Sequence, residues 1–458
     1  MKNFTSPTLI DFENWLNSFL NFEKLPQKNM FWLDTMETLC KLSGNINTSC
    51  PSIHVAGSKG KGSTAAFISS ILNEAGLKTG LYTSPHIKTF FERITQNQKL
   101  FTPSVYEKSA KELMELINTR EVKRIQKERN ITWFELVTMY AFFCFKNAKT
   151  DAAVYEVGLG GRLDATNVIK PLVCCINTIE LEHTEFLGDS LEKIAEEKGG
   201  IIKENTPVII AEQSENVKKV FRKIAHTKNA PIIFVDEICP KISIKFHTYS
   251  YKLSKNNLMS VEIESPLFER PLKTDLKMAG EFQAKNAALA ALAVKTAFPQ
   301  ISLKKIEKGL SKAYLPARFE VSAKINKFNK ISSLILDGAH TVKSIQNTLD
   351  TMQKCFSQKN QKRILLFACA ADKDIDDIAP LFKNKFDKIY LTKPGSTKLS
   401  DLKKIKNAFD RTKQTYDIDE NYENQINKAL SQANNEKALI LVTGSFYLVA
   451  EVKKIIEK

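Results

Sequence analysis

The amino-acid sequence predicts an α/β protein of two domains, and three observations lead to this prediction. The chain has 458 residues, which exceeds the length at which a single hydrophobic core usually stops growing. Short apolar, β-branched segments alternate with helical patterns, as in parallel βαβ units. A loop rich in glycine, serine and lysine follows the first of these strands. We therefore expect a larger α/β domain followed by a smaller one.

The larger domain is expected over residues 1–314. Its strands are predicted at 52–56, 152–157, 173–179 and 207–210, with helices such as 64–75 and 191–197 between them. From about Ile242 to Lys277 the pattern changes to strand-like alternation of apolar and polar residues. We therefore expect an antiparallel patch that flanks the main sheet.

The smaller domain is expected over residues 315–458, because the segment 314–318, which contains Pro316, follows two helices and is typical of a boundary. Strands are predicted beyond it at 334–337, 363–370, 388–393 and 438–445. This pattern predicts a Rossmann-like domain with about four parallel strands. Ligands of such folds bind at the carboxyl ends of strands, so we expect a site between the two domains.

Charge and composition limit the classes of partner. Lys and Arg total 67 against 51 Asp and Glu, a formal charge of +16, which favours an anionic partner such as a nucleotide, a polycarboxylate or a nucleic acid. The basic residues are scattered among acidic ones, so we expect no nucleic acid. No run of about 18 apolar residues and no leader-like segment is found, so we expect a cytoplasmic protein without a membrane partner.

Eight cysteines occur singly or side by side in apolar segments, without CxxC spacing. We expect reduced thiols in the core, although a catalytic cysteine stays an alternative. Nothing in the sequence demands more than a monomer.

The sharpest motif is His54-Val-Ala-Gly-Ser-Lys-Gly-Lys-Gly-Ser63, between a strand and a helix. Glycines let backbone N–H groups close around phosphate, the helix N-terminus adds positive potential, and Lys61 can reach the terminal phosphates. The spacing is shorter than the general GxxxxGK[ST] form, so a loop without a ligand stays an alternative. The candidate nucleotide-binding residues of this loop are Gly57, Ser58, Lys59, Gly60, Lys61, Gly62 and Ser63.

Polar residues follow several predicted strands. Ser84 lies in LYTSPH after a short strand, Glu156 ends the strand AAVYE, and His183 follows the strand that begins at Val173. Such residues suit Mg²⁺ beside a bound polyphosphate, since oxygen ligands are preferred. Taken singly, they are equally compatible with a turn serine, a buried carboxylate and a capping histidine.

The ordered strings HVAGSKGKGS, SPH, EVGLGGRLDATN, EEKGGIIK and DGAH resemble the folylpolyglutamate synthase and dihydrofolate synthase family of the Mur ligase superfamily. The resemblance implies a phosphate-loop ligase domain with a Rossmann-like partner domain. It also implies ATP and two Mg²⁺ ions, with activation of a carboxylate as an acyl phosphate that L-glutamate attacks. The acceptor would be a folate, and dihydropteroate is the second candidate.

Three rival hypotheses remain at this point. Another Mur-type amide ligase that acts on a cell-wall precursor would share the phosphate loop and the metal residues. A phosphate-loop phosphotransferase would lack the DGAH element, and a basic nucleic-acid-binding module would give Glu156, His183 and Lys198 no role.

The resemblance implies roles for residues in the first domain. Ser84 and Glu156 would hold one Mg²⁺, and His183 would serve the second, with Lys61 and Lys198 also catalytic and Lys198 carbamylated. Alternatively, Lys198 is an exposed lysine paired with Glu196 or Glu197. The substrate residues would be Thr132, Trp133, Phe134, Glu135, Leu163, Asp164 and Ala165. As a pattern by itself, TWFELVT is more typical of a helix core.

The resemblance also implies roles on the other side of the nucleotide. Asn286, near Gln283, would contact adenine, and Arg318 would bridge the phosphates. Asp337 would bind ribose or the incoming amino acid, and His340 would line the substrate site.

The sequence departs from the family pattern at three places near these groups. Lys59 replaces the usual Asn, Glu182 the usual Asp, and Thr341 the usual Asn. The GLxR-like element of dihydropteroate-binding members is not recognisable at 29–34. Glutamate addition to a folate is therefore the firmer expectation.

Overall fold

The structure, a computed structural model, describes residues 7–21, 33–249, 258–322, 328–358, 360–396 and 398–457. It divides into two compact units. The first comprises Met1–Ser243, Val261–Thr274 and Phe282–Tyr314, and the second comprises Ile244–Ser260, Asp275–Glu281 and Leu315–Lys458. Each unit contains a largely parallel sheet with helices, which confirms the predicted α/β class.

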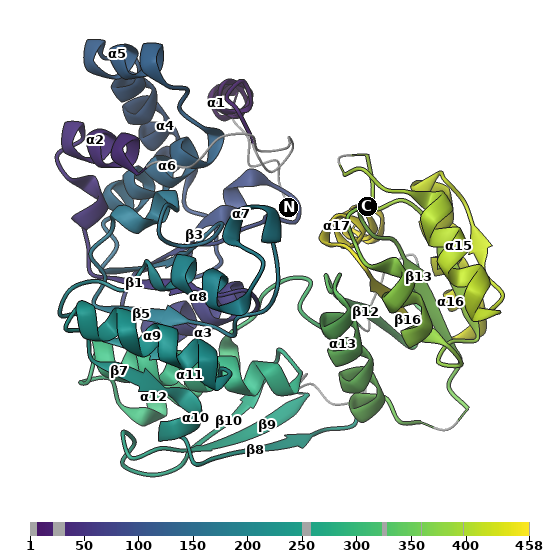
Figure 1. The fold of residues 1–458 in the computed structure, drawn as a ribbon. Helices are drawn as coiled ribbons and strands as arrows, with labels where there is room; N and C mark the ends of the chain where they lie inside the picture. The colour runs from purple at the N-terminus through teal and green to yellow at the C-terminus, as the bar shows by residue number, and fades with distance from the viewer. Residues whose placement is uncertain are drawn as a thin grey trace. The chain divides into compact units, whose positions relative to one another are not determined.

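The first unit is built around a seven-stranded sheet with the order β3-β2-β4-β1-β5-β6-β7, of which Figure 1 labels β3, β1, β5 and β7. All neighbouring pairs are parallel except β2 and β3. The strands predicted from sequence are present, and β3 and β7 were not predicted. The bounds are β1 Ser52–Ala56, β2 Thr79–Tyr82, β3 Ile94–Gln96, β4 Ala152–Glu156, β5 Val173–Ile176, β6 Val208–Ile210 and β7 Ile232–Phe234.

The register of the central strands brings the candidate residues to one edge of this sheet. Val55 of β1 pairs with Glu156 of β4, and Ala56 pairs with Ile176 of β5. Tyr82 of β2 pairs with Tyr155. Because these strands are parallel, the segments after them emerge side by side at their carboxyl ends. That edge is where the phosphate loop begins.

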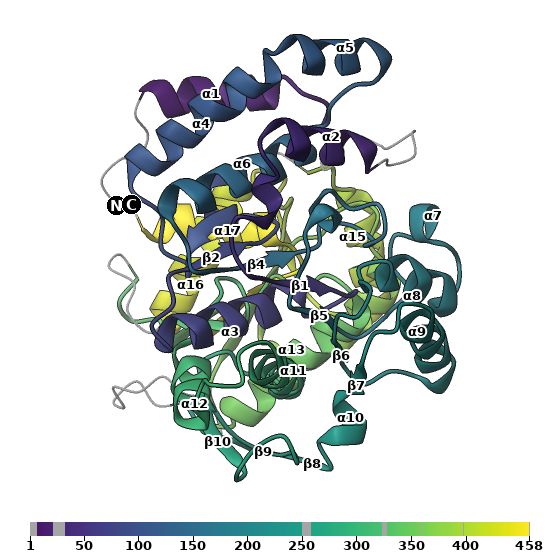
Figure 2. The ribbon, with the colours of Figure 1, turned by 90° about the vertical axis from the view of Figure 1, so that its left-hand side faces the viewer.

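Helices cover both faces of the sheet in this unit, as Figure 2 shows. Helix α6 lies on one face with α1, α2 and α4 beyond it, and α3 lies on the other face with α11 and α12. Helix α6 is apolar on nearly all sides, which is the pattern of a fully buried helix. The bounds are α1 Pro7–Asn17, α2 Asp34–Leu42, α3 Lys61–Glu74, α4 Pro103–Ile117, α5 Arg120–Glu128, α6 Trp133–Ala148, α11 Glu281–Ala297 and α12 Leu303–Lys312.

Further short helices border the strands β5, β6 and β7. Helix α8 packs with α9, and their apolar side chains share a core with these strands. The bounds are α7 Thr184–Leu187, α8 Leu191–Gly199, α9 Glu215–Thr227 and α10 Val235–Ile238, with the 3-10 helices η1 Ile46–Thr48, η2 Phe90–Arg93 and η3 Ala165–Val168.

A separate three-stranded sheet has the order β10-β9-β8 and lies where the flanking patch was predicted. Its strands are β8 Lys241–Phe246, β9 Met259–Glu264 and β10 Leu272–Leu276. The connection 265–271 is shorter than a parallel crossover requires, so β9 and β10 are antiparallel. The boundaries of the two compact units run through this sheet.

The second unit contains a six-stranded sheet with the order β11-β12-β16-β13-β14-β15. Strand β11 is antiparallel to β12 and the other pairs are parallel. The four predicted strands are present, and β11 and β15 add one short strand at each edge. The bounds are β11 Glu320–Ser322, β12 Ser333–Leu336, β13 Arg363–Phe367, β14 Lys388–Leu391, β15 Asp417–Ile418 and β16 Leu439–Thr443.

The core of the second unit includes side chains from outside residues 315–458. Tyr249 is buried and its ring lies 5.1 Å from that of Phe356, and Ala279 belongs to the same apolar cluster. The helices of this unit are α13 Val342–Cys355, α14 Ile375–Ile378, η4 Ala379–Phe382, α15 Leu402–Thr412, α16 Tyr422–Glu436 and α17 Phe446–Ile456. Within the parts of the chain described above, no helix is long and apolar enough to span a bilayer.

All eight cysteines fall in described segments and are free thiols. Seven of them are buried and Cys50 is half-buried. Burial raises the thiol pKa, for example to about 12 in Cys40 and in Cys369, so these thiols stay protonated. The expected core position is therefore confirmed for seven of the eight cysteines.

Candidate active site

The phosphate loop begins at Gly57, directly after β1, and ends at Gly60, which caps α3. Both glycines have positive φ, of 134° and 91°. A Cβ atom at Gly57 would lie 2.6 Å from Cβ of Asn177, and one at Gly60 would lie 2.6 Å from Oδ1 of Asn286. Both positions therefore need glycine for two independent reasons, conformation and space. Helix α3 starts at Lys61, three residues before the predicted position.

A buried chain of side-chain amides supports this loop from β5 and α11. Nδ2 of Asn177 donates to Oγ1 of Thr64 and to Oδ1 of Asn286, both at 2.9 Å. Nδ2 of Asn286 donates to Oε1 of Gln283 at 3.1 Å, and Nε2 of Gln283 donates to Oγ of Ser63 at 3.2 Å. The start of helix α3, the segment after β5 and helix α11 are thereby fixed to one another. Asn177 was not predicted from the sequence. The one signal for it is that it is a polar residue directly after the buried strand β5.

Two lysine side chains converge on the carbonyl oxygen of Gly57. Nζ of Lys61 donates to it at 2.9 Å and also lies 3.4 Å from the Ser58 carbonyl oxygen. Nζ of Lys198, from α8, donates to the same Gly57 oxygen at 3.0 Å. Lys198, which was predicted to be catalytic, thus contacts the phosphate loop directly.

Lys198 is almost fully buried and does not pair with Glu196 or Glu197 through any hydrogen bond or ion pair recorded for it. The alternative of an exposed surface lysine is therefore wrong. Burial, followed by the nearby Lys61 ammonium, lowers the pKa of Lys198 from 10.5 to about 8, although Glu182 opposes the shift. The neutral fraction near neutral pH is then larger than that of an ordinary lysine, and only a neutral amine can add CO₂.

The Glu182 carboxylate lies among three lysines. Its Oε1 accepts a hydrogen bond from Nζ of Lys198 at 3.0 Å, and its Oε2 lies 3.5 Å from Nζ of Lys59. Burial would raise the pKa of Glu182, but Lys61, Lys198 and Lys59 together lower it to about 2. Lys59 and Glu182 are two of the three departures from the family pattern. The structure shows that they contact each other.

The predicted metal residues are partly assembled. Glu156 is buried at the end of β4, and its Oε2 accepts a hydrogen bond from the Ser84 backbone N–H at 3.0 Å. His183 lies at the start of α7 with a φ of 47°. In the described segments, no three His, Cys, Asp or Glu side chains form a metal-binding group. The predicted set contains only two residues of these types, and its carboxylate and hydroxyl oxygens are ligands that Mg²⁺ accepts.

The segment that was predicted to bind substrate begins with a helix cap. Thr132 and Glu135 form a capping box at the start of α6, in which Oε2 of Glu135 accepts from the Thr132 N–H at 2.8 Å. Oε1 of Glu135 accepts from Arg129 at 2.9 Å. Trp133 is buried beneath the Arg93 guanidinium, 4.9 Å from the ring centre. These contacts match the alternative interpretation as helix core.

Phe134 is placed differently from its neighbours. Its half-buried ring covers Gly158, where a Cβ atom would lie 2.4 Å from Cζ of the ring. The ring centre also lies 6.1 Å from that of Tyr82. Of the residues predicted in this segment, Phe134 is therefore the one beside the glycine-rich loop that follows β4.

Asp164 closes that glycine-rich loop. Its Oδ2 accepts from the backbone N–H groups of Gly158 at 3.0 Å and Leu159 at 2.9 Å. Its Oδ1 accepts from the Thr166 N–H, which caps the 3-10 helix that starts at buried Ala165. Burial raises the pKa of Asp164 despite these bonds. Leu163, beside it, is half-buried.

In the second unit, Phe446 organises two of the predicted residues. The Arg318 guanidinium lies 4.2 Å from the centre of the Phe446 ring, a cation–π geometry. The His340 ring lies 5.9 Å away, edge to face, and His340 Nδ1 is 2.8 Å from the Gly338 carbonyl oxygen. A Cβ atom at Gly338 would overlap the Phe446 ring. Phe446 therefore contacts Arg318, His340 and Gly338 together, and no role was predicted for it from the sequence.

Asp337 ties two loops of the second unit together. Its Oδ2 accepts from the Phe319 N–H at 2.7 Å, and its Oδ1 accepts from the Ala339 N–H at 2.8 Å. Burial raises the pKa of Asp337, against these bonds and the nearby Arg318 charge. Thr341, the third departure, forms a capping box with Ser344 and starts α13. The substitution therefore supplies a conventional helix start at this loop.

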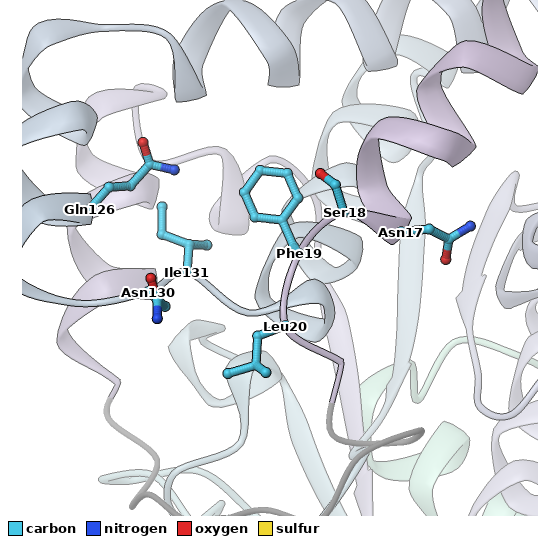
Figure 3. A pocket seen from close by; sticks show the side chains of 7 residues that line it. All are labelled: Asn17, Ser18, Phe19, Leu20, Gln126, Asn130 and Ile131. Carbon is cyan, nitrogen blue, oxygen red and sulfur yellow. The ribbon is translucent and has the colours of Figure 1, made fainter.

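Two cavities have linings that include none of these residues. One, of about 500 Å³, is lined by Asn17, Ser18, Phe19, Leu20, Gln126, Asn130 and Ile131, as Figure 3 shows. The other, of about 820 Å³, lies beyond the ends of β14 and β15 and includes Lys393, Lys398 and Glu423. Neither cavity is lined by a predicted site residue.

A glycine- and lysine-containing phosphate loop after the central parallel strand, with a carboxylate at the end of the next strand, defines a nucleotide-binding α/β protein. The Mur ligase middle domain matches residues 55–294, and the glutamate ligase domain of Mur ligases matches residues 317–446. The chain belongs to the Mur ligase family, in its branch of folylpolyglutamate and dihydrofolate synthases.

Individual relatives agree over nearly the whole length. A dihydrofolate synthase/folylpolyglutamate synthase of Bacillus subtilis is 29% identical over 449 residues, which cover 97% of this chain and 98% of the relative. The crystal structure of folylpolyglutamate synthase from Thermotoga maritima has a TM-score of 0.81 at 28% identity, covering 98% and 96% of the two chains.

The Mycobacterium tuberculosis folylpolyglutamate synthase, solved with ADP and AMPPCP, has a TM-score of 0.82 at 25% identity, covering 98% of each chain. These similarities confirm the family resemblance that the motifs indicated. They do not favour the alternative of a ligase for cell-wall precursors.

Proposed function

We propose that the chain is an ATP-dependent ligase that adds L-glutamate to a folate. The observation that carries the proposal is the buried Lys198 ammonium on the Gly57 carbonyl of the phosphate loop, at the strand edge where Glu156 meets Ser84. Relatives that match nearly the full length are named as folylpolyglutamate synthases, and one of them is solved with ADP and AMPPCP.

The proposed reaction has two steps. The γ-phosphoryl group of ATP passes to a carboxylate oxygen of the folate's terminal glutamate, which gives an acyl phosphate and ADP. The amine of free L-glutamate then attacks the acyl carbon, phosphate leaves with the C–O bond electrons, and the amine loses a proton. No protein nucleophile takes part, so catalysis rests on positioning and electrostatic stabilisation.

The residues of the first unit bind the polyphosphate. Backbone N–H groups from Gly57 to Ser63 and the N-terminus of α3 face the phosphates, and Lys61 neutralises charge on the transferred group. Ser84, Glu156 and His183 would hold Mg²⁺, because they lie at or just beyond strand ends next to the loop. Bound Mg²⁺ supplies positive charge that offsets the repulsion between the phosphate and the carboxylate.

We assign Lys198 as the carbamylated lysine of this site. Its lowered pKa favours addition of CO₂ to the neutral amine, with loss of one proton. The resulting anion would need cations around it, and Lys59 and Lys61 contribute charge to the same group of side chains.

The other assignments follow the positions of the motifs. Asn286 would reach the base, since it lies directly beneath Gly60. Arg318, Asp337 and His340 would bind the nucleotide phosphates, the ribose or amino acid, and the substrate, respectively. Phe134 would contact the flat ring of the folate, because it covers the glycine-rich loop that contains Gly158.

Dihydropteroate is the second candidate acceptor. The Bacillus subtilis relative carries both synthase names, which favours a second activity. Segment 29–34, which shows no GLxR-like element, lies outside the described residues except for Leu33 and Asp34.

A phosphate-release assay tests the proposal. ATP, Mg²⁺ and glutamate are supplied with tetrahydrofolate or with dihydropteroate, and the glutamylated product is identified by mass. Release with tetrahydrofolate is expected, and Lys61→Ala should abolish it while the circular dichroism spectrum is unchanged. Lys108→Ala, which removes an exposed lysine of α4, is the matched control. Absence of release with both acceptors would defeat the folate assignment.

A further inference from the structure

Lys59 and Lys198 share the Glu182 carboxylate unequally. Lys198 is buried, donates to Glu182 at 3.0 Å and is also held by the Gly57 carbonyl oxygen. Lys59 lies 3.5 Å from the same carboxylate, which is an ion pair without a short hydrogen bond, and about a third of its side chain is exposed. Glu182 is its one recorded salt-bridge partner among the described residues.

The charge at this place is unbalanced. Three ammonium groups, of Lys59, Lys61 and Lys198, surround the Glu182 carboxylate, and the charge of Glu180 also acts on Lys59, so three cations face two anions. Lys61 and Lys198 are anchored on the Gly57 carbonyl oxygen, whereas Lys59 has no such hydrogen-bonded anchor among the described residues. Lys59 is therefore the cation that can move when an anion with several charges enters the loop.

We propose that Glu182 is a positioning residue that holds Lys59 aside in the nucleotide-free enzyme and gives it up to the polyphosphate of the bound nucleotide. Two lysines of the phosphate loop, Lys59 and Lys61, then bind the phosphates. While Lys198 is an unmodified ammonium, Glu182 keeps its hydrogen bond to it, so releasing Lys59 leaves no buried carboxylate unpaired. This inference rests on the proposed function only in taking a nucleotide as the natural anion.

The direction of the exchange follows from electrostatics. A polyphosphate offers several oxygens and more than one negative charge, whereas Glu182 offers Lys59 one oxygen at 3.5 Å in a partly solvated position. Gly60, the next residue, has a φ of 91° and starts the turn into α3, so Lys59 lies at the mouth of the anion-binding helix terminus. Moving the ammonium from carboxylate to phosphate therefore requires a change in the side chain alone.

A double-mutant cycle with isothermal titration calorimetry tests this exchange. Inorganic tripolyphosphate and ADP are titrated separately, in the presence of EDTA, into the wild type, Lys59→Met, Glu182→Gln and the double variant. We expect Lys59→Met to weaken tripolyphosphate binding about tenfold. We expect Glu182→Gln to tighten it about fivefold in the wild-type background and less than twofold in the Lys59→Met background. Lys108→Met, on the exposed surface of α4, controls for net charge.

Each outcome of the titrations either supports or overturns the exchange of Lys59 between Glu182 and the phosphates. Equal tightening by Glu182→Gln in both backgrounds, or no binding of tripolyphosphate to the wild type, would overturn the exchange. Binding of tripolyphosphate with the expected coupling, but no binding of ADP, would support the exchange and count against the proposed function. If Glu182→Gln unfolds, the same cycle is run with Glu182→Asp, which keeps a carboxylate for Lys198 but shortens its reach to Lys59. The expected coupling keeps its sign, with a smaller size.

Discussion

Gly57 and Asn177 are in such close contact that a Cβ atom on the glycine would lie 2.6 Å from Cβ and 2.8 Å from the backbone nitrogen of Asn177. The phosphate loop therefore leaves β1 in direct contact with the backbone of the segment that follows β5. The same asparagine fixes the first turn of α3 and helix α11 through its side-chain amide. Asn177 thus determines the path of the loop after β1 and also holds the loop against α3 and α11.

We expect Gly57→Ala to lower the free energy of unfolding by about 2 kcal/mol or more and to weaken ADP binding, because the new methyl group forces the loop and β5 apart. The control is Gly76→Ala. Gly76 also has positive φ, 101°, but a Cβ atom added there would meet no other atom within 4 Å. Chemical denaturation of both variants separates steric contact from backbone strain. Equal losses would show that the contact with Asn177 contributes nothing.

Asn177→Ala should lower the free energy of unfolding by about 1–3 kcal/mol, because it leaves Oγ1 of Thr64 and Oδ1 of Asn286 without their buried donor. ADP binding should weaken as well, since the loop loses its attachment to α11. Asn427→Ala removes an exposed amide that donates to the Glu423 carbonyl oxygen within α16 and should cost almost nothing. Normal ADP affinity in a destabilised Asn177→Ala variant would contradict the supporting role.

Lys198 should make stability rise with pH. Its pKa is lowered from 10.5 to about 8 in the folded chain, so between these values the unfolded chain binds more protons than the folded one. The free energy of unfolding therefore increases as pH rises from about 8 to about 10.5. Urea titrations across this range should show a slope that Lys198→Met removes. An identical slope in this variant would contradict the assignment.

Carbamate formation gives a second measurement on the same residue. Isotopically labelled bicarbonate should give a carbamate signal in the wild type, and Lys198→Met should abolish it. Lys193 lies in the same helix but is exposed and paired with Asp189, so Lys193→Met should leave the signal unchanged. Small carboxylic acids should restore part of the ligase activity of Lys198→Ala.

Glu135→Ala should reduce stability by about 1–3 kcal/mol and leave the KM for folate within twofold, because the carboxylate caps α6 and pairs with Arg129. Phe134→Ala is the comparison, since its ring lies beside Gly158 and its loss should raise the KM for folate. Thermal unfolding and steady-state kinetics on both variants separate the two roles. A large rise in KM for Glu135→Ala at unchanged stability would restore it as a substrate contact.

Phe446→Leu should raise the KM for ATP about fivefold with little change in unfolding temperature, because it keeps apolar volume but removes the ring face that the Arg318 guanidinium covers. Phe446→Tyr retains that face and should restore the KM. A merely structural role would predict that both variants change stability and not KM.

The parallel strands and the phosphate loop could be predicted because their signals are local. The run SIHVA before Gly57 is rich in apolar and β-branched residues, and the closely spaced glycines and lysines after it are typical of a loop that binds phosphate. The same holds for Glu156 and Lys198, whose motifs stand in a recognisable order. Strands β3, β7, β11 and β15 have two or three residues each and carry too little pattern to be seen.

The supporting contacts could not be predicted because they join residues that are distant in sequence. Lys59 and Glu182 were seen separately as departures, and only the fold brings them within 3.5 Å. Asn177 and Asn286 form a hydrogen bond although they are 109 residues apart in the sequence. Glu135 and Asp164 were expected at the substrate, but nearby backbone N–H groups take up their oxygens.

The chain passes between its two units at Ser243, Ser260, Thr274, Glu281 and Tyr314, and this makes the second unit inseparable from the middle of the sequence. A fragment that begins at Leu315 would keep every strand of the six-stranded sheet, yet Phe356 would lose the ring of Tyr249 and the shared core would lose Ala279. Such a fragment would expose apolar surface and aggregate. A chimera that takes its second unit from a relative would fold only if the segments 244–260 and 275–281 came from the same relative as residues 315–458.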